Sequence, residues 1–333
     1  MADLITVVRF ILSPPILAPI VYPGLIVALI TVLIVIWLER KFAALVQLRI
    51  GPYYVSRQLH GALQLVADGA RFFFQEVIIP ITVDRRAFVL APILSLAFIS
   101  LSFTVIPGGP GVYGFYSPYN LLIALAVTSL GPIMVLVAGW AANNKFTYIG
   151  GAREALLTMA YEPLLFAGAF AGALMYNSLD LNVMVEKQAS TGIPGIVANP
   201  LAALLFLLAM MAATDRIPFD IVLGEQEIVS GPYTEYTGIM YGVVMGLDYI
   251  KLYALSLIFT DMFLAGWAPF NSMLLGSIVV YVKTFIVIAV AVFMRTVYGR
   301  LRLDHALDLL WSKLIPLAFV ATLISVASSM IYP

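Results

Sequence analysis

Residues 17–38 read LAPIVYPGLIVALITVLIVIWL and contain no charged side chain. A helix needs about 20 apolar residues to cross the hydrocarbon core of a bilayer, so this stretch predicts a membrane-spanning helix. The whole chain repeats this character: of its 333 residues, 62% are hydrophobic and only 11% are charged. In a soluble domain about a quarter of the residues are charged, and such a domain could not bury so much apolar surface. The sequence therefore predicts an all-α polytopic membrane protein.

Further apolar runs bring the expected number of spanning helices to about eight. They lie near residues 17–38, 88–106, 121–140, 155–176, 201–213, 238–263, 273–293 and 314–331. The fifth run is short, so we expect its helix to begin in the preceding loop. We predict a single membrane domain over residues 1–333.

The distribution of Lys and Arg predicts the orientation. Fourteen of these 18 residues fall in four alternate loops, at 40–86, 141–154, 214–237 and 294–313, and only Arg9 and Lys187 lie on the other side. Loops rich in Lys and Arg face the cytoplasm, so we expect a multi-pass protein of the cell membrane with both termini on the non-cytoplasmic side. The loop at 40–86 has apolar stretches broken by charges, which predicts an amphipathic helix lying in the membrane interface. The other cytoplasmic loops are expected to be folded.

Composition also limits the chemistry. The chain has no Cys, two His and a net charge of zero. A thiolate metal site or iron–sulfur cluster bound by this chain is therefore excluded, no metal site is expected, and there is no basic excess to attract nucleic acid. Any redox cofactor must be held by another subunit, and the lipid bilayer is the partner that composition implies.

Five ionisable residues fall within the expected spans: Glu162, Asp248, Lys251, Asp261 and Lys283. Such groups cost several kcal/mol in a bilayer unless they are paired or hydrated. Asp248 and Lys251 share one helical face because they are three residues apart, and a buried ion pair that fixes helix packing would explain them alone. Five groups in one chain favour a polar pathway instead.

The segment 215–235 reads DRIPFDIVLGEQEIVSGPYTE and is acidic on the side that should be basic. A solvated acidic loop is the usual explanation, but apolar residues are interleaved throughout, which indicates a folded loop partly within the interface. Carboxylates crowded at low dielectric repel one another, so some should hold protons near neutral pH. That property suits a proton relay.

A series of motifs in order gives a resemblance to a known family. They include ERKFAALVQLRIGP at 39–52, ADGARFFFQEVIIP at 67–80, AGWAANNKF at 138–146, AREALLTMAYE at 152–162, RIPFDIVLGEQEIVSGPYTEYTG at 216–238 and FMRTVYGRLRLDHALDLLWSKLIP at 293–316. Together they resemble the H subunit of NADH:quinone oxidoreductase, called subunit 1 in mitochondrial respiratory complex I. The resemblance covers nearly the whole chain and agrees with the eight expected spans.

The resemblance implies a membrane subunit of a proton-translocating NADH (or related donor):quinone oxidoreductase. Such a subunit forms much of the chamber that quinone enters and the first part of an acidic path to antiporter-like subunits. Quinone is then a substrate, and this non-redox subunit binds no cofactor itself. The implied partners are hydrophilic iron–sulfur and quinone-site subunits on the cytoplasmic side, and antiporter-like and small membrane subunits.

The site residues follow from these motifs and from the intramembrane charges. The positions expected to couple charge and protons are Glu39, Glu162, Glu225, Glu227, Glu235, Asp248 and Asp261. The positions expected in the quinone chamber and its loops are Arg40, Arg49, Asp68, Glu76, Arg153, Arg216, Asp220 and Arg295.

The chain departs from the family pattern at several positions. Leu223 stands where the family has a Glu, Asp248 precedes Tyr249 where a Glu is usual, and Asp261 lies where a neutral residue is common. We hypothesise that Asp261 compensates for the carboxyl absent at Leu223. These departures, with Leu157 and Ala160 in place of Gln and Ser, indicate a divergent member, such as an archaeal one.

Two other functions stay open from the sequence alone. One is the equivalent subunit of a membrane-bound hydrogenase or a methanophenazine-linked dehydrogenase, although Glu39 favours a quinone enzyme. The other is a stand-alone secondary transporter, which intramembrane charges and broken helices would permit. A transporter should be active alone, whereas a complex subunit should copurify with iron–sulfur proteins.

Overall fold

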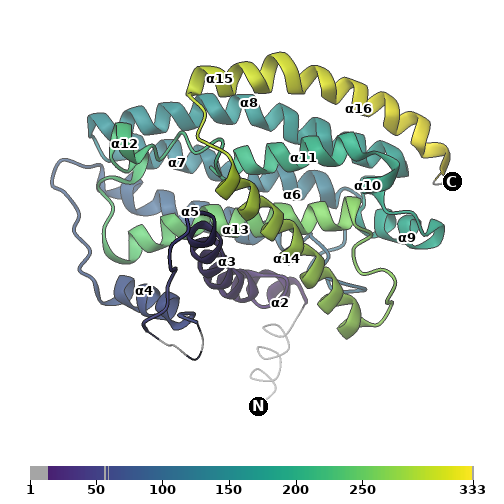
Figure 1. Ribbon diagram of the computed structural model, residues 1–333, viewed down its shortest axis with the longest axis horizontal. Coiled ribbons are helices and arrows are strands. Elements are labelled where there is room, and N and C mark those ends of the chain that lie inside the picture. The colour runs from purple at the N-terminus through teal and green to yellow at the C-terminus, as the bar shows by residue number, and fades with distance from the viewer. Residues whose placement is uncertain (1–13, 56–57, 59, 332–333) are drawn as a thin grey trace, which may run out of the picture.

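The computed structural model of the protein describes residues 14–55, 58 and 60–331, and within these the chain forms helices without a β-strand (Figure 1). Seven helical stretches are long and apolar enough to span a membrane, and α11 (Pro200–Ala213) is a shorter apolar helix. The predicted all-α polytopic fold is confirmed, with the fifth span short as expected. The other α-helices are α2 (Pro14–Ile20), α3 (Leu25–Val46), α4 (Leu63–Phe74), α5 (Arg85–Ser102), α6 (Asn120–Thr128), α7 (Leu130–Ala141), α8 (Lys145–Tyr176), α9 (Leu181–Thr191), α10 (Gly195–Ala198), α12 (Glu225–Ile228), α13 (Gly238–Phe263), α14 (Met273–Val297), α15 (Leu303–Asp308) and α16 (Ile315–Ser328).

Helix α13 forms the core of the bundle. Every residue from 250 to 263 is buried, and the helix packs against α14, α5, α3 and α4. A helix that is apolar on all sides is stable only when other helices surround it, which is its position here. Helices α8, α11 and α16 run side by side as a second layer (Figure 1). We refer below to the end of the bundle with α4 and α12 as the α4 end and to the other as the α9 end.

Three helices continue into segments that the sequence placed in loops. Residues 40–46 extend α3, residues 145–154 are the first turns of α8, and residues 303–313 begin the last span as α15 and a π-helical turn, Leu309–Leu314. Charged side chains led to the shorter prediction. Their backbones remain helical because good helix formers flank the spans, and in α8 the helix continues through Gly150 and Gly151.

Two connections at the α4 end are ordered by packing. Helix α4 is the amphipathic helix expected in the segment 40–86: Leu65 is buried, whereas Phe73 and Phe74 are exposed. The connection between α11 and α13 is folded, as predicted, because Phe219, Ile221 and other apolar residues enter the core.

Glycines on α7 and α8 let this connection approach closely. A Cβ built on Gly150 would lie 2.5 Å from the backbone nitrogen of Pro232 in the 3₁₀ turn Gly231–Tyr233, and one on Gly139 would lie 2.7 Å from the carbonyl oxygen of Thr147. Small residues permit such contacts between helix backbones. The glycines therefore hold the acidic connection against α8.

Gly150→Ala should destabilise the protein, because the added methyl group would push the connection away from α8 and overpacking costs about 1–3 kcal/mol. Gly246→Ala is the matched control, since nothing lies within 4 Å of a Cβ at that helical position. Thermal unfolding in detergent should show a lower midpoint for Gly150→Ala and an unchanged or higher one for Gly246→Ala. Equal midpoints would contradict the close packing.

Candidate functional site

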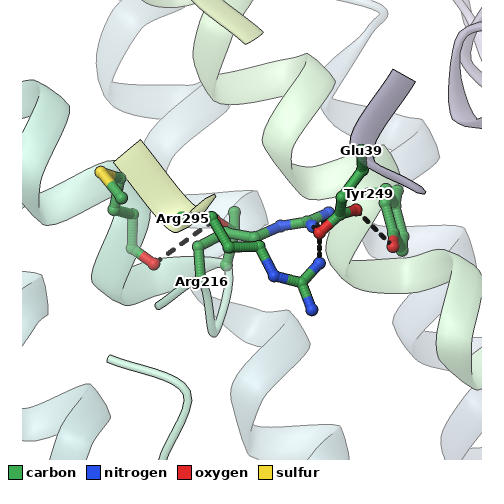
Figure 2. A network of polar contacts seen from close by, with 6 residues as sticks. Glu39, Arg216, Tyr249 and Arg295 are labelled. Carbon is green, nitrogen blue, oxygen red and sulfur yellow. Dashed lines mark hydrogen bonds and ion pairs between the residues drawn. The ribbon is translucent and has the colours of Figure 1, made fainter. Parts of the chain in front are cut away.

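A carboxylate shared by two arginines joins four segments of the chain. Glu39 of α3 accepts hydrogen bonds from Arg216 Nη1 at 2.9 Å and 2.8 Å on its two oxygens, and from the Tyr249 hydroxyl at 2.8 Å. Arg295 of α14 forms an ion pair with the same carboxylate. Figure 2 shows these four side chains converging from α3, α13, α14 and the connection after α11. We call them the Glu39 cluster.

The end of α11 positions Arg216 in this cluster. Asp215 has a left-handed φ of 47°, and the backbone N–H of Arg216 donates to the carbonyl of Met211 at 3.0 Å. This turn closes the helix C-terminus and reverses the chain, as C-terminal capping motifs do. The Arg216 guanidinium then stacks 4.0 Å from the centroid of the Tyr249 ring.

The Glu39 cluster carries one negative and two positive charges. Glu39 and Arg216 are 7% and 3% exposed, so their ion pair is shielded from water. Nε and Nη2 of Arg216 are enclosed and have no hydrogen-bond partner among the described residues. Buried donors require acceptors, so this guanidinium can still bind water or a ligand oxygen.

A second buried group of charges lies beside the first. It contains Glu154 of α8, Asp248 and Lys251 of α13, and Asp215, all of which interact electrostatically. Glu154 and Lys251 are 4% and 6% exposed, and Oε2 of Glu154 has no hydrogen-bond partner in the described part of the chain. Asp248 also interacts with Arg216, which links the two groups. We call these four residues the Glu154 cluster.

Crowding shifts the pKa of Asp215, the member of the Glu154 cluster that lies in the connection after α11. Burial, together with the charges of Glu154 and Asp248, raises the pKa of Asp215 well above its usual value. Three carboxyl groups face one ammonium group in this cluster, so the shift relieves repulsion. The direction of this shift is the one that the expectation for the acids of the segment 215–235 requires.

Hydroxyl groups extend the Glu154 cluster along one face of α8. Lys251 Nζ donates to the Tyr161 hydroxyl at 3.2 Å, Thr158 lies 3.2 Å from that hydroxyl, and Thr158 donates to Glu154 at 3.2 Å. A Tyr161 hydroxyl that donates to Thr158 would give a continuous chain of donors from Lys251 to Glu154. Glu162 interacts electrostatically with Lys251 and Glu154, and its Oε1 is enclosed without a hydrogen-bond partner.

A third ionic contact lies at the surface of the α4 end. Glu227 of α12 pairs with Arg153 of α8 at 2.6 Å and with Arg300 at 3.3 Å. The hydrogen bond from Arg153 and then the charge of Arg300 lower the pKa of Glu227. These residues line a surface pocket of about 520 Å³.

The remaining predicted residues are distributed around these clusters. Asp220 interacts electrostatically with Asp215 and Asp248. Glu235 accepts a hydrogen bond from Asn144 at 2.6 Å. Glu225 begins α12, and its side chain lies outside the described part of the structure.

Four predicted chamber residues lie farther out. Arg40 pairs with Asp68 at 2.8 Å and so ties α4 to α3. Arg49 is exposed and donates to Gln47 at 2.6 Å, and Glu76 is exposed on the chain after α4. The structure does not place Arg49 and Glu76 in either buried cluster.

Asp261 also lies apart from the clusters. It is thirteen residues beyond Asp248 on α13, which corresponds to about 20 Å along a helix. It interacts electrostatically with Lys283, whereas Leu223 packs with apolar residues at the α4 end. This separation gives no support to the hypothesis that Asp261 replaces a carboxyl at position 223.

Sequence reasoning missed Glu154, Arg300 and the hydroxyls of Thr158 and Tyr161. The spacing of Glu154, Thr158 and Tyr161, at four and then three residues, would have placed them on one helical face. Glu154 was instead assigned to a loop that the structure shows as the start of α8. In the described ranges of the chain, no group of three or more acidic or His residues has the arrangement of a metal site.

Glu39→Gln should lower the thermal stability of the protein strongly, because removing one partner of a buried ion pair costs about 3–5 kcal/mol. Glu39→Gln combined with Arg295→Gln should lose less stability than the sum of the single variants, since the double change removes one of the stranded positive charges. Glu186→Gln, an exposed site on α9, is the control. Strict additivity of the unfolding midpoints would contradict the shared carboxylate.

Comparison with known families identifies the family of the chain. The model of the family described as NADH dehydrogenase matches residues 20–326, a range that includes every described residue of both buried clusters. The match covers most of the chain and therefore goes beyond a local motif. The chain belongs to this NADH dehydrogenase family, the family of subunit 1 (H) of complex I.

Proposed function

We propose that this protein is the membrane subunit of a proton-translocating NADH (or related donor):quinone oxidoreductase that forms part of the quinone chamber and the first part of the proton-coupling path. The observation that carries the proposal is the electrostatic interaction between the two buried clusters, which acts between Arg216 of the Glu39 cluster and Asp248 of the Glu154 cluster. A charge that changes at the first can therefore alter protonation at the second.

The Glu39 cluster is the group that, in this proposal, first responds to reduction of the quinone. With two guanidinium groups and one carboxylate, it favours negative charge nearby, and Arg216 keeps two N–H groups without acceptors. Quinone is the substrate, and the electrons come from iron–sulfur subunits that assemble on the α4 end. When the quinone is reduced, the added negative charge attracts protons, and the attraction is stronger in this buried region than in water.

The Glu154 cluster is the proposed proton relay. Its carboxyl groups repel one another, so a small change in potential changes how many protons they hold. Lys251, Tyr161 and Thr158 connect to Glu154 through hydrogen bonds, and Glu162 lies beside Lys251. Moving one charge against 100 mV requires about 2.3 kcal/mol, which a redox step can supply.

The ion pairs of Glu227 at the surface connect α12 to α8, the helix that carries Glu154. Glu227 holds α12 to α8 through Arg153 and to the segment before α15 through Arg300. Arg153 precedes Glu154 directly, so movement of α12 would alter the position of the buried carboxyl group. Glu227 and Glu235 thus have a place in the coupling path, together with Glu162 and Asp248, toward antiporter-like subunits in the membrane.

Glu154→Gln tests the relay. We expect proteoliposomes of the complex to translocate about tenfold fewer protons per quinone reduced, or worse, because removing an acid–base group typically costs at least a factor of 100 in its step. Glu154→Asp should restore part of the activity. The measurement pairs quinone reduction with the pH change across the membrane.

Asp308→Asn is the control for Glu154→Gln, because Asp308 is exposed on α15 and outside both clusters. It should keep the wild-type ratio of protons to electrons. A wild-type ratio in Glu154→Gln would refute the relay, even if the total rate of quinone reduction fell.

Asp215 should hold its proton to a higher pH than an exposed Asp does, because burial and the charges of Glu154 and Asp248 raise its pKa. Infrared spectra recorded over a pH titration should therefore show a protonated carboxyl band that persists above about pH 4 and that Asp215→Asn removes. Raising the pH should remove the band in the wild type, since deprotonation occurs as pH passes the folded-state pKa. Loss of the band near pH 4, as in an exposed Asp, would contradict the proposed environment.

A further inference from the structure

Two charged side chains that belong to neither buried cluster meet at the α9 end of the bundle. Asp261 lies near the C-terminal end of α13, Lys283 lies on α14, and the two interact electrostatically. Both side chains lie against the loop at residues 264–268, which follows α13 and leads toward α14. The hydrogen-bond partners of each group indicate its charge state.

Lys283 closes this loop with its side-chain nitrogen. Nζ donates to the carbonyls of Leu264, Gly266 and Ala268, each at 2.8 Å. Three donated hydrogen bonds require the ammonium form, because a neutral amine has only two hydrogens. The C-terminal end of α13 favours a positive charge at this place. Lys283 is therefore a cation that holds three turns of backbone carbonyl toward one point.

The carboxyl group of Asp261 has no such partners. Asp261 is 0% exposed, and both its Oδ1 and its Oδ2 are enclosed without a hydrogen-bond partner among the described residues. In a static ion pair the ammonium group would donate to the carboxylate, since buried charges are paired and hydrogen-bonded. Lys283 donates to carbonyls instead. This arrangement fits a protonated, neutral Asp261.

Gly266 lies between the two groups. Its carbonyl accepts from Lys283 at 2.8 Å, and a Cβ built on it would lie 2.8 Å from Oδ1 of Asp261. Ala265 and Gly266 have left-handed φ values of 57° and 39°. A residue with a side chain rarely adopts this conformation and keeps it only where surrounding contacts impose it. The shape of the loop therefore depends on the bonds from Lys283.

Lys283 is the charged partner of Asp261 in the described part of the chain. On α9, Gln188 is uncharged, and its Nε2 donates to the backbone carbonyl of Asp261 at 2.8 Å. The other titratable side chains around this end of α13 are phenols, which ordinarily ionise only near about pH 10. They are Tyr253 on the same helix, Tyr22 before α3, Tyr281 on α14 and Tyr176 on α8.

We propose that Asp261 is a proton-binding site that controls the loop at 264–268 through Lys283. While Asp261 is protonated, the ammonium group holds the three carbonyls. When the proton leaves to water at the α9 end, the new carboxylate attracts the ammonium group, and this attraction is strong at low dielectric. Lys283 then turns to Asp261 with its own proton retained, and the loop is released. This device shares no residue with the relay proposed above.

The two helices can stay in place while the side chain moves. Thr284, next to Lys283, donates to the hydroxyl of Thr260 at 3.2 Å, and Thr260 precedes Asp261 directly. This bond joins α14 to α13 at the level of the two charges. The change is therefore confined to the Lys283 side chain and the loop.

Hydrogen–deuterium exchange of the complex in nanodiscs tests the proposal. The backbone N–H groups of Leu264, Ala265, Gly266 and Ala268 are all hydrogen-bonded, so release of the loop should increase their exchange. Exchange is followed by mass spectrometry from about pH 5 to about pH 9, where the phenols stay neutral. An unfolded sample supplies the correction for the intrinsic pH dependence. Corrected protection should fall with rising pH, by up to about tenfold per pH unit, because opening releases one proton.

Asp261→Asn should remove this pH dependence, because Asn keeps the shape of the side chain but cannot ionise. Its loop should stay as protected at high pH as the wild-type loop is at low pH. Asp308→Asn is the matched control, since Asp308 is exposed on α15, and it should keep the wild-type dependence.

The sign of the pH dependence in the wild type decides the question without any variant. A static ion pair would lose protection as pH falls, because protonation of Asp261 would break it. Protection that falls with decreasing pH, or that does not change with pH, would overturn the proposal. A wild-type dependence retained in Asp261→Asn would overturn it as well.

Discussion

The carboxylate of Glu39 is the contact on which the arrangement of this end of the protein depends. It lies inside the bundle, yet it is bound by groups from α13, α14 and the connection after α11. In a bilayer, van der Waals packing alone must otherwise hold helices together, because lipid tails are as apolar as the helices themselves. One buried anion with two guanidinium groups thus fixes the relative positions of three spanning helices and the turn that starts the acidic connection.

The same interaction explains why further charges can exist beside it. An isolated ionisable group in a membrane is costly, but each charge added near an existing cluster is partly stabilised by the others. Arg216 belongs to the first cluster and also interacts with Asp248 of the second. The two clusters therefore form one electrostatic unit, and the family assignment implies that the chain assembles with other subunits of complex I.

The sequence predicted the fold well because its main signals are local. Apolar runs identify spans, and the motifs around Glu39, Arg216 and Arg295 identify the cluster members without showing that they meet. Their convergence could not be predicted, since it depends on helix packing between segments as far apart in the chain as Glu39 and Arg295. Glu154 was missed because charged residues at a helix end resemble a loop, and Asp261 was joined to the coupling residues by charge alone, although its position is about 20 Å away.

The hydrogen bonds that join Lys251, Tyr161, Thr158 and Glu154 run in one direction when the Tyr161 hydroxyl donates to Thr158. If a proton passes along them, each hydroxyl group gives up one hydrogen ahead and takes one from behind, so both end up oriented backward. A second proton cannot follow until both hydroxyl groups have rotated. Such a chain transmits one proton and must then be reset, and the rotation of the two hydroxyl groups would separate one turnover from the next.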